Sequence, residues 1–166
     1  MLRGMSWHAL KPADASAFNE APFVYRFPVR LSVPPERVWE SIASDRSMWD
    51  WNLGVKRLTW TSPRPFGVGT TREVVLPFGA MTVREQFFRW DEGKGYSFYV
   101  TDTNRPVVEQ FAEDYAIEPD GAGSVFTWTI ALEPKRALGP LMRLAGPLNK
   151  MAFGQVPRAA KKYFAR

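Results

Sequence analysis

Apolar and polar residues alternate along residues 23 to 33, FVYRFPVRLSV. Every odd-numbered position is apolar, whereas Arg26 and Arg30 fall on the opposite face. A period of two with one polar face is typical of a strand in an antiparallel sheet. Pro28 lacks a backbone N–H, which favours a position at the edge of the sheet or at a bulge.

Six further segments between residues 55 and 132 have the composition of strands. They are rich in valine, threonine and aromatic residues, and turn-forming glycine, proline, aspartate and asparagine separate them. Because the connections are short, neighbouring segments are expected to pair as hairpins. The sequence therefore predicts seven antiparallel strands, the later six over 55–61, 70–76, 81–90, 96–101, 107–117 and 124–132.

Two short helices are predicted between the first and second strands. The segment VPPERVWESIA, residues 33 to 43, begins with prolines and places Val38 and Ile42 four residues apart, as in a helix entered through proline. A second short helix is predicted over residues 45 to 52, DRSMWDWN. Trp49 and Trp51 in this segment either pack the helix pair onto the sheet or form part of the mouth of a cavity.

The hydrophobic period changes to that of a helix over residues 137 to 164. Apolar residues gather on one side and basic residues on the other, which predicts a long amphipathic helix. Gly146-Pro147, Gly154 and Pro157 are expected to bend it, because an internal proline removes a hydrogen bond. The basic face, called the basic stripe below, comprises Arg136, Arg143, Lys150, Arg158, Lys161 and Lys162.

This order of elements predicts an α+β fold in which a curved sheet wraps around one long helix. Seven strands at ~4.8 Å span roughly 34 Å, whereas a helix is only about 10 to 12 Å across. One helix therefore cannot fill the concave face of such a sheet. A cavity lined by apolar residues is expected between the sheet, the long helix and the short helix pair.

Four segments of the chain resemble the SRPBCC superfamily. This group of helix-grip proteins includes START domains, polyketide cyclase/dehydrase-like proteins and birch-pollen-allergen-like proteins. The resemblance covers about residues 23 to 165 and implies a deep cavity for a lipid, a polyketide or another apolar small molecule. No catalytic motif of the superfamily carries over onto this chain. The segments are VPPERVWESIASDRSMWDWNLGVKRL, FGVGTTREVV, VREQFFRWDEG and DYAIEPDGAGSVFTWTIALEP.

Composition limits the chemistry that this chain of 166 residues can perform. It contains no cysteine and a single histidine, His8, which argues against thiolate or Ser-His nucleophiles and against a metal site. We expect no cofactor. An arm over residues 1–22 and a single domain over 23–166 are predicted. Neither a signal peptide nor a membrane span is recognisable, so we expect a soluble, cytoplasmic protein.

Side-chain parity along the strands, together with the apolar face of the long helix, selects the candidate residues of the cavity. Alternate residues of a strand point to the same face of a sheet. The predicted cavity residues are Trp49, Trp51, Met81, Val83, Glu85, Phe87, Phe98, Val100, Phe111, Glu113, Tyr115, Phe126, Trp128, Leu141, Met142, Ala145, Leu148 and Ala152.

Glu85 and Glu113 are exceptional because they fall on otherwise apolar faces. A buried carboxylate must be paired, protonated or bound to another group, since isolated burial of its charge costs several kcal/mol. A structural explanation is an ion pair with an arginine such as Arg72, or a bulge that turns the side chain outward. The functional alternative is that Glu85, Glu113 or Tyr115 transfers a proton.

The leading functional hypothesis is the binding or carriage of a hydrophobic small molecule in the cavity. The alternative is a polyketide cyclase or dehydratase that uses the three candidate catalytic residues. Net charge is +5, and residues 133 to 166 carry eight Lys or Arg residues against one Glu. This basic stripe indicates either transient contact with an anionic membrane or a solvated helix face. Nucleic acid is not expected as a partner, because no known nucleic-acid-binding module fits.

Overall fold

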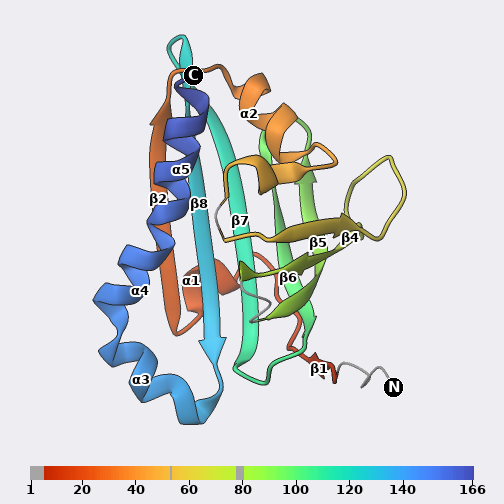
Figure 1. Ribbon diagram of the computed structural model, residues 1–166, viewed down its shortest axis with the longest axis vertical. Helices are drawn as coiled ribbons and strands as arrows, with labels where there is room; N and C mark the ends of the chain where they lie inside the picture. The colour runs from red at the N-terminus through yellow and green to blue at the C-terminus, as the bar shows by residue number, and fades with distance from the viewer. Residues whose placement is uncertain (1–5, 53, 78–80) are drawn as a thin grey trace.

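The computed structural model describes residues 6–52, 54–77 and 81–166. A curved antiparallel sheet forms most of the molecule, and helices cover it (Figure 1). Its order is β2-β8-β7-β6-β5-β4-β3, with the short β1 paired to β6. This arrangement confirms the predicted helix-grip fold and its seven strands. The strands are β1 (His8–Ala9), β2 (Phe23–Leu31), β3 (Arg57–Trp60), β4 (Thr71–Val75), β5 (Thr82–Asp91), β6 (Gly95–Thr103), β7 (Val108–Asp120) and β8 (Gly123–Pro134).

Hairpins fix the register of the central strands. Tyr115 of β7 lies opposite Trp128 of β8, and Trp128 lies opposite Phe27 of β2. These residues therefore form one row across the sheet, which places their side chains on the same face. On the other side of β7, Glu113 lies opposite Phe98 of β6. The register thus brings one carboxyl group into the middle of an aromatic surface.

Two short helical elements and the end of the chain fill one part of the concave face. The elements are α2 (Pro35–Ile42) and η1 (Ser47–Asp50), a single turn of 3-10 helix. Val38 and Ile42 of α2 are fully buried because they pack against the aromatic rows of the sheet. The hydrophobic core of the protein lies here, between α2, η1, the C-terminal helix and strands β5 to β8.

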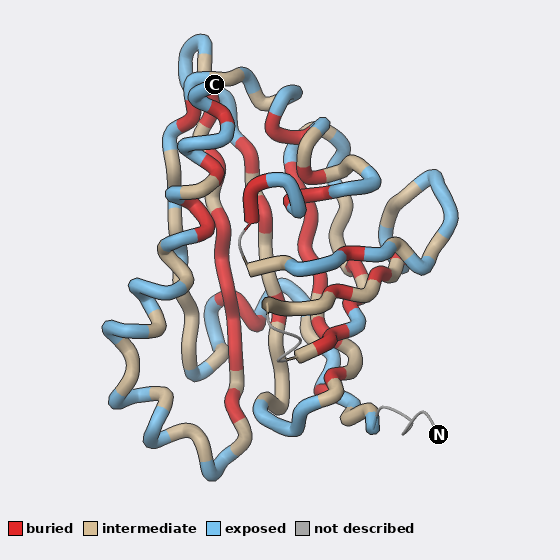
Figure 2. Tube along the Cα trace, viewed as in Figure 1, coloured by how far each residue is buried: buried red, intermediate tan, exposed pale blue. Residues whose placement is uncertain are grey.

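The predicted C-terminal helix is divided into consecutive pieces. After η3 (Arg136–Leu138) come α3 (Gly139–Leu144), α4 (Gly146–Phe153) and α5 (Gln155–Phe164), and the breaks fall where Gly146 and Gly154 were expected to bend the helix. Only α5 buries side chains, against β2, whereas α3 and α4 have no buried residue (Figures 1 and 2). No helix in the described part of the chain combines the length and apolar content needed to cross a bilayer.

The N-terminal arm packs on the convex face of the sheet. Its helix α1 (Ala17–Glu20) contacts β7 and β8, and Phe18 joins a small cluster with Ala112 and Ala131. β1 extends the edge of β6 beyond the residues that β7 occupies. The arm therefore covers the face of the sheet opposite the core.

Candidate functional site

A cavity of about 670 Å³ lies between the concave face of the sheet and the segment from η3 to α5. Its walls are inward-facing residues of β3 to β8, the loop after η1, and residues of α3, α4 and α5. Apolar side chains dominate. The polar groups that reach its surface among the described residues are Asn52, Arg72, Glu85, Glu113, Tyr115, Trp128 and Gln155.

Most of the residues predicted to line a cavity do so in the structure. Strand parity placed nine of them correctly, and the C-terminal helices supply the remainder. The predicted residues on the cavity wall are Met81, Val83, Glu85, Phe98, Val100, Phe111, Glu113, Tyr115, Trp128, Leu141, Met142 and Ala152.

The two tryptophans of η1 and its C-cap do not line the cavity, which corrects their predicted position. Trp51 is buried in the core, where it packs against Phe126 and Phe164 and donates a hydrogen bond to the Ser41 hydroxyl at 3.0 Å. Trp49 points away from the sheet and is 36% exposed, with the Arg46 guanidinium stacked on its ring. Trp51 therefore packs the η1 segment onto the sheet, and neither ring forms the cavity mouth.

Four other predicted residues also lie outside the cavity wall. Phe87 and Phe126 have the expected facing, but they lie where α2 and η1 cover the sheet, so their rings belong to the core. Ala145 occupies the break between α3 and α4, and Leu148 is 63% exposed. Both expectations assumed a single helix with one continuous inward face, which the breaks at the glycines prevent.

Sequence reasoning did not select the wall that β3 and β4 contribute. Leu58, Val74 and Leu76 line the cavity from this side. Their parity was readable, because Val74 and Leu76 share a face with Arg72. The sequence pattern did not predict how far the curvature of the sheet turns these edge strands toward the C-terminal helices.

Arg72 and Glu85 form a buried ion pair beside the cavity. They face each other across β4 and β5, with Arg72 Nε donating to Glu85 Oε2 at 2.5 Å. The guanidinium lies against the rings of Phe98 and Phe87, at 4.6 and 4.9 Å from their centroids, and donates to the Ser47 hydroxyl at 3.3 Å. This is the structural explanation proposed for Glu85 from the sequence.

The two partners of this pair remain charged together. Burial alone would lower the pKa of Arg72, but the neighbouring Glu85 carboxylate holds that pKa above its usual value. Burial raises the pKa of Glu85, and the charge of Arg72 opposes the rise. Removing one partner would leave a buried charge without its counter-ion, which is strongly destabilising.

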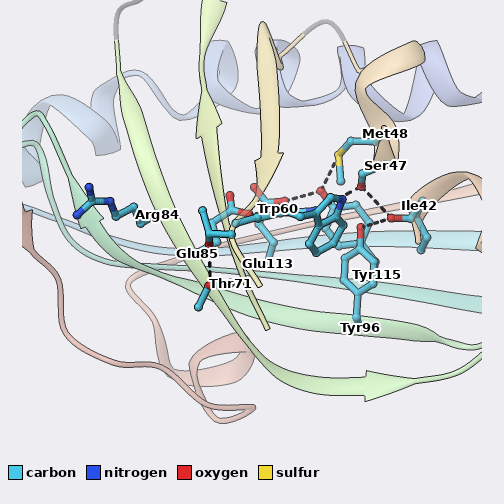
Figure 3. A network of polar contacts seen from close by, with 12 residues as sticks. Ile42, Ser47, Met48, Trp60, Thr71, Arg84, Glu85, Tyr96, Glu113 and Tyr115 are labelled. Carbon is cyan, nitrogen blue, oxygen red and sulfur yellow. Dashed lines mark hydrogen bonds and ion pairs between the residues drawn. The ribbon is translucent and has the colours of Figure 1, made fainter. Parts of the chain in front are cut away.

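Among the described residues, none forms an ion pair with Glu113 as Arg72 does with Glu85. The Oε2 atom of Glu113 accepts hydrogen bonds from the Tyr115 hydroxyl at 2.6 Å and from Trp128 Nε1 at 2.8 Å. The Tyr115 hydroxyl also contacts the Met48 sulfur at 3.2 Å, below η1 (Figure 3). Neither of the structural explanations offered from the sequence applies to Glu113, because none of the described arginines forms an ion pair with it and the β7–β8 register is regular around it.

The surroundings of Glu113 favour its protonated form. Burial, followed by the repulsion of Glu85, raises its pKa to about 7, although Tyr115, Trp128 and Arg72 act in the opposite direction. Burial and the Glu113 charge raise the pKa of Tyr115 well above its usual value, so this hydroxyl remains a donor. The site therefore combines an apolar cavity with one carboxyl group that titrates near neutral pH.

Comparison with known proteins agrees with this architecture. Residues 25–162 match the family described as polyketide cyclase / dehydrase and lipid transport. The chain belongs to this family. An uncharacterized protein of Mycobacterium tuberculosis (strain H37Rv) is 32% identical over 148 residues, which cover 89% of this chain and 88% of that protein. The resemblance to the SRPBCC superfamily is thereby confirmed.

Solved structures share the fold at low sequence identity. A START superfamily protein from Mycobacterium smegmatis superposes with a TM-score of 0.69 at 12% identity, covering 86% of this chain and 97% of that one. A truncated norcoclaurine synthase from Thalictrum flavum gives a TM-score of 0.57 at 15% identity, covering 81% and 91% respectively. These similarities establish the helix-grip fold and leave the ligand of this family member open.

The pKa of Glu113 leads to a prediction about stability. Because its folded-state pKa of about 7 exceeds the ordinary value of 4.5, the folded protein holds this proton more tightly than the unfolded chain. Stability should therefore fall as pH rises from about 4.5 to about 7, by about 2 to 3 kcal/mol from this group alone. The Glu113→Gln variant should not show this pH-dependent loss of stability.

Urea unfolding of the wild type and the variant over this pH range measures the difference. Groups that do not interact with Glu113 titrate alike in both proteins and cancel from the comparison. A stability difference that stays constant with pH would contradict the raised pKa.

Proposed function

We propose that this protein binds and carries a hydrophobic small molecule in the cavity between its sheet and its C-terminal helices. The observation that supports this proposal is the volume of about 670 Å³ with a wall that is almost entirely apolar. Cavities of about 300 to 1,000 Å³ with few polar groups are typical of sites for small organic ligands. A ligand here would cover apolar surface that otherwise contacts water, which is favourable in proportion to its area.

The arrangement of the core favours binding over simple underpacking. The half of the concave face under α2, η1 and α5 is closely packed with aromatic rings, and its polar side chains are paired. The space is confined to the half under α3 and α4, next to Phe111 and Leu132. Because one half of the sheet is closely packed with aromatic side chains, a bound ligand explains the open half better than a general shortage of core residues.

Filling the cavity should abolish binding. Val108 lines it and is only partly buried, so a Val108→Trp substitution would place an indole in the ligand volume. Val125→Trp is a matched control, because Val125 faces away from the cavity on β8. We expect mass spectrometry of organic extracts to recover a bound compound from the wild type and the control, and at least about tenfold less from Val108→Trp.

The outcome that would reject the carrier proposal is an empty wild-type protein. Such a protein would yield no compound on extraction and would also fail to bind added fatty acids, sterols or aromatic dyes. Equal yields from Val108→Trp and Val125→Trp would place the ligand elsewhere.

A second candidate function is acid–base catalysis on the bound molecule. Glu113 supports it, since a carboxyl group whose pKa is about 7 can both give and take a proton at neutral pH. Tyr115 donates to this carboxyl group and would orient it. A cyclase or dehydratase would need such a group beside a flexible substrate held in a reactive conformation.

Tyr115→Phe separates the two candidate functions. If the protein is an enzyme, this change should lower turnover of a polyketide-like substrate by about 100-fold while its affinity changes little. A carrier would show no turnover with either protein. Turnover that is unchanged in Tyr115→Phe would exclude Tyr115 from the chemistry.

We also propose that the C-terminal segment docks transiently on an anionic membrane. All six residues of the basic stripe are exposed, and no Asp or Glu occurs between residues 134 and 166. Beside them α3 and α4 expose Leu144 at 82% and Leu148 at 63%. Large apolar side chains interspersed with cations match a lipid surface, in which the former enter the interface and the latter pair with headgroups.

A groove beside α5 extends the basic surface. It lies between β2 and α4–α5, and its wall includes Lys150, Arg158, Lys161 and Arg26 of the neighbouring strand. Lys150, Arg158 and Lys161 complement the phosphate of a lipid headgroup. The Arg26 guanidinium instead donates to the Phe18 carbonyl of α1. Each cation near an anionic surface contributes about 1 kcal/mol, so this cluster suffices for reversible docking.

Vesicle co-sedimentation tests this docking. The wild type should bind vesicles that contain phosphatidylglycerol and dissociate from them at high salt. It should not bind vesicles of phosphatidylcholine. The triple variant Arg143→Glu, Lys150→Glu, Arg158→Glu should lose at least about tenfold in binding. Its control carries the same change of charge on other exposed cations, Lys56→Glu, Arg57→Glu and Lys94→Glu, and should bind as the wild type does.

Equal sedimentation of the two triple variants, or binding that does not depend on lipid charge, would contradict the docking proposal. The basic stripe would then be a solvated helix face.

A further inference from the structure

The two oxygens of the Glu113 carboxyl group have different surroundings. Oε2 accepts both hydrogen bonds, from Tyr115 and from Trp128. No described residue donates to Oε1, and the side chain lines the cavity and remains partly exposed. Arg72, another donor on the cavity wall, donates to Glu85 and to Ser47. Oε1 of Glu113 is therefore an unused hydrogen-bonding position on the cavity wall.

The donors at Oε2 also decide where a proton on Glu113 can reside. The indole N–H of Trp128 can only donate, so Oε2 must act as an acceptor. While Tyr115 also donates to Oε2, both donors occupy that oxygen, and a proton on Glu113 is accommodated at Oε1 of this cavity-lining side chain. The cavity thus presents an acceptor when Glu113 is ionised and a donor when it is neutral.

A wholly apolar ligand would be poorly matched to this position. It would remove water from Oε1 without replacing the lost hydrogen bond, and burying an unpaired polar group costs more than most contacts gain. Phe98 and Ile130, which flank Glu113 on the adjacent strands, offer no compensation. The ligand itself must supply the partner.

We infer that the ligand has an apolar body ending in a hydroxyl group, and that this hydroxyl hydrogen-bonds to Oε1 of Glu113. This inference rests on the proposed carrier function and specifies its ligand class. A hydroxyl group suits the position because it donates to the carboxylate and accepts from the carboxylic acid. An ether or ketone can only accept, so it pairs with the protonated form alone.

Dodecanol and its methyl ether are suitable probes, because they differ only in the hydroxyl hydrogen and the methyl group that replaces it. At roughly pH 8.5, where Glu113 is ionised, the wild type should bind the alcohol about tenfold more tightly than the ether. At roughly pH 5.5 the carboxylic acid donates to either compound, so the preference should largely disappear. Other ionisable groups around Glu113 are Arg72, Glu85, Tyr96 and Tyr115, and both compounds meet them alike.

Glu113→Gln provides an independent test. Its side-chain carbonyl should accept from Tyr115 and Trp128, which turns the amide NH₂ group toward the cavity as a fixed donor. Both compounds accept from this group, so the preference for the alcohol should be lost at every pH. Glu118→Gln is the matched control, since Glu118 is exposed on the same strand and does not line the cavity.

The possible failures are distinguishable. If neither compound binds the wild type, the hydroxyl inference is overturned. The carrier proposal fails with it when organic extracts also yield no compound and added fatty acids, sterols and aromatic dyes do not bind. If both compounds bind but the ether binds as tightly as the alcohol at the higher pH, the carrier proposal stands and the hydroxyl inference is overturned. The measurements on the wild type remain decisive even if Glu113→Gln does not fold.

Discussion

The concave face of the sheet is wider than the helix that must cover it, and this mismatch determines where the protein has open space. α5 packs on β2 and buries Val156, Ala160 and Phe164, while α2 and η1 cover the adjoining part of the face. These elements leave the area beneath α3 and α4 unfilled. Gly146-Pro147 and Gly154 interrupt the helix in this region. As a result, α3 and α4 are displaced from the sheet and enclose a cavity.

The polar groups of the cavity fall into two classes with different consequences. Arg72 and Glu85 satisfy each other, and aromatic rings surround the guanidinium, so this pair links the neighbouring strands β4 and β5. Only one oxygen of the Glu113 carboxyl group accepts hydrogen bonds from the described residues, and burial raises the pKa of this group to about 7. A group of this kind reduces stability when it is ionised. Such a cost is more often found at functional sites than in ordinary cores.

The C-terminal segment combines two roles because its pieces are short. Leu141 and Met142 of α3 and Ala152 of α4 contribute to the cavity wall, whereas Leu144 and Leu148 point outward beside the basic stripe. Residues of the cavity wall, basic residues and exposed leucines therefore lie on the same short helices. A long straight helix would have buried one face fully and left no such combination.

The sequence by itself predicted the seven main strands, the hairpin pairing of the later six and the side of the sheet that each residue faces, whereas the pairing of β2 with β8 and of β1 with β6 came from the tertiary structure. Period-two alternation and turn residues are local signals, and hairpins of short connection leave little choice of topology. The same signals identified Glu85 and Glu113 as carboxylates on apolar faces. Only the tertiary structure decided which part of the concave face is packed and which is open. The elements α2, η1 and α5 cover Phe87, Phe126 and Trp51, which therefore belong to the core. Phe98 and Trp128 reach the cavity wall instead. That distinction depends on where elements distant in sequence meet the curved sheet, and alternation along one strand carries no information about it.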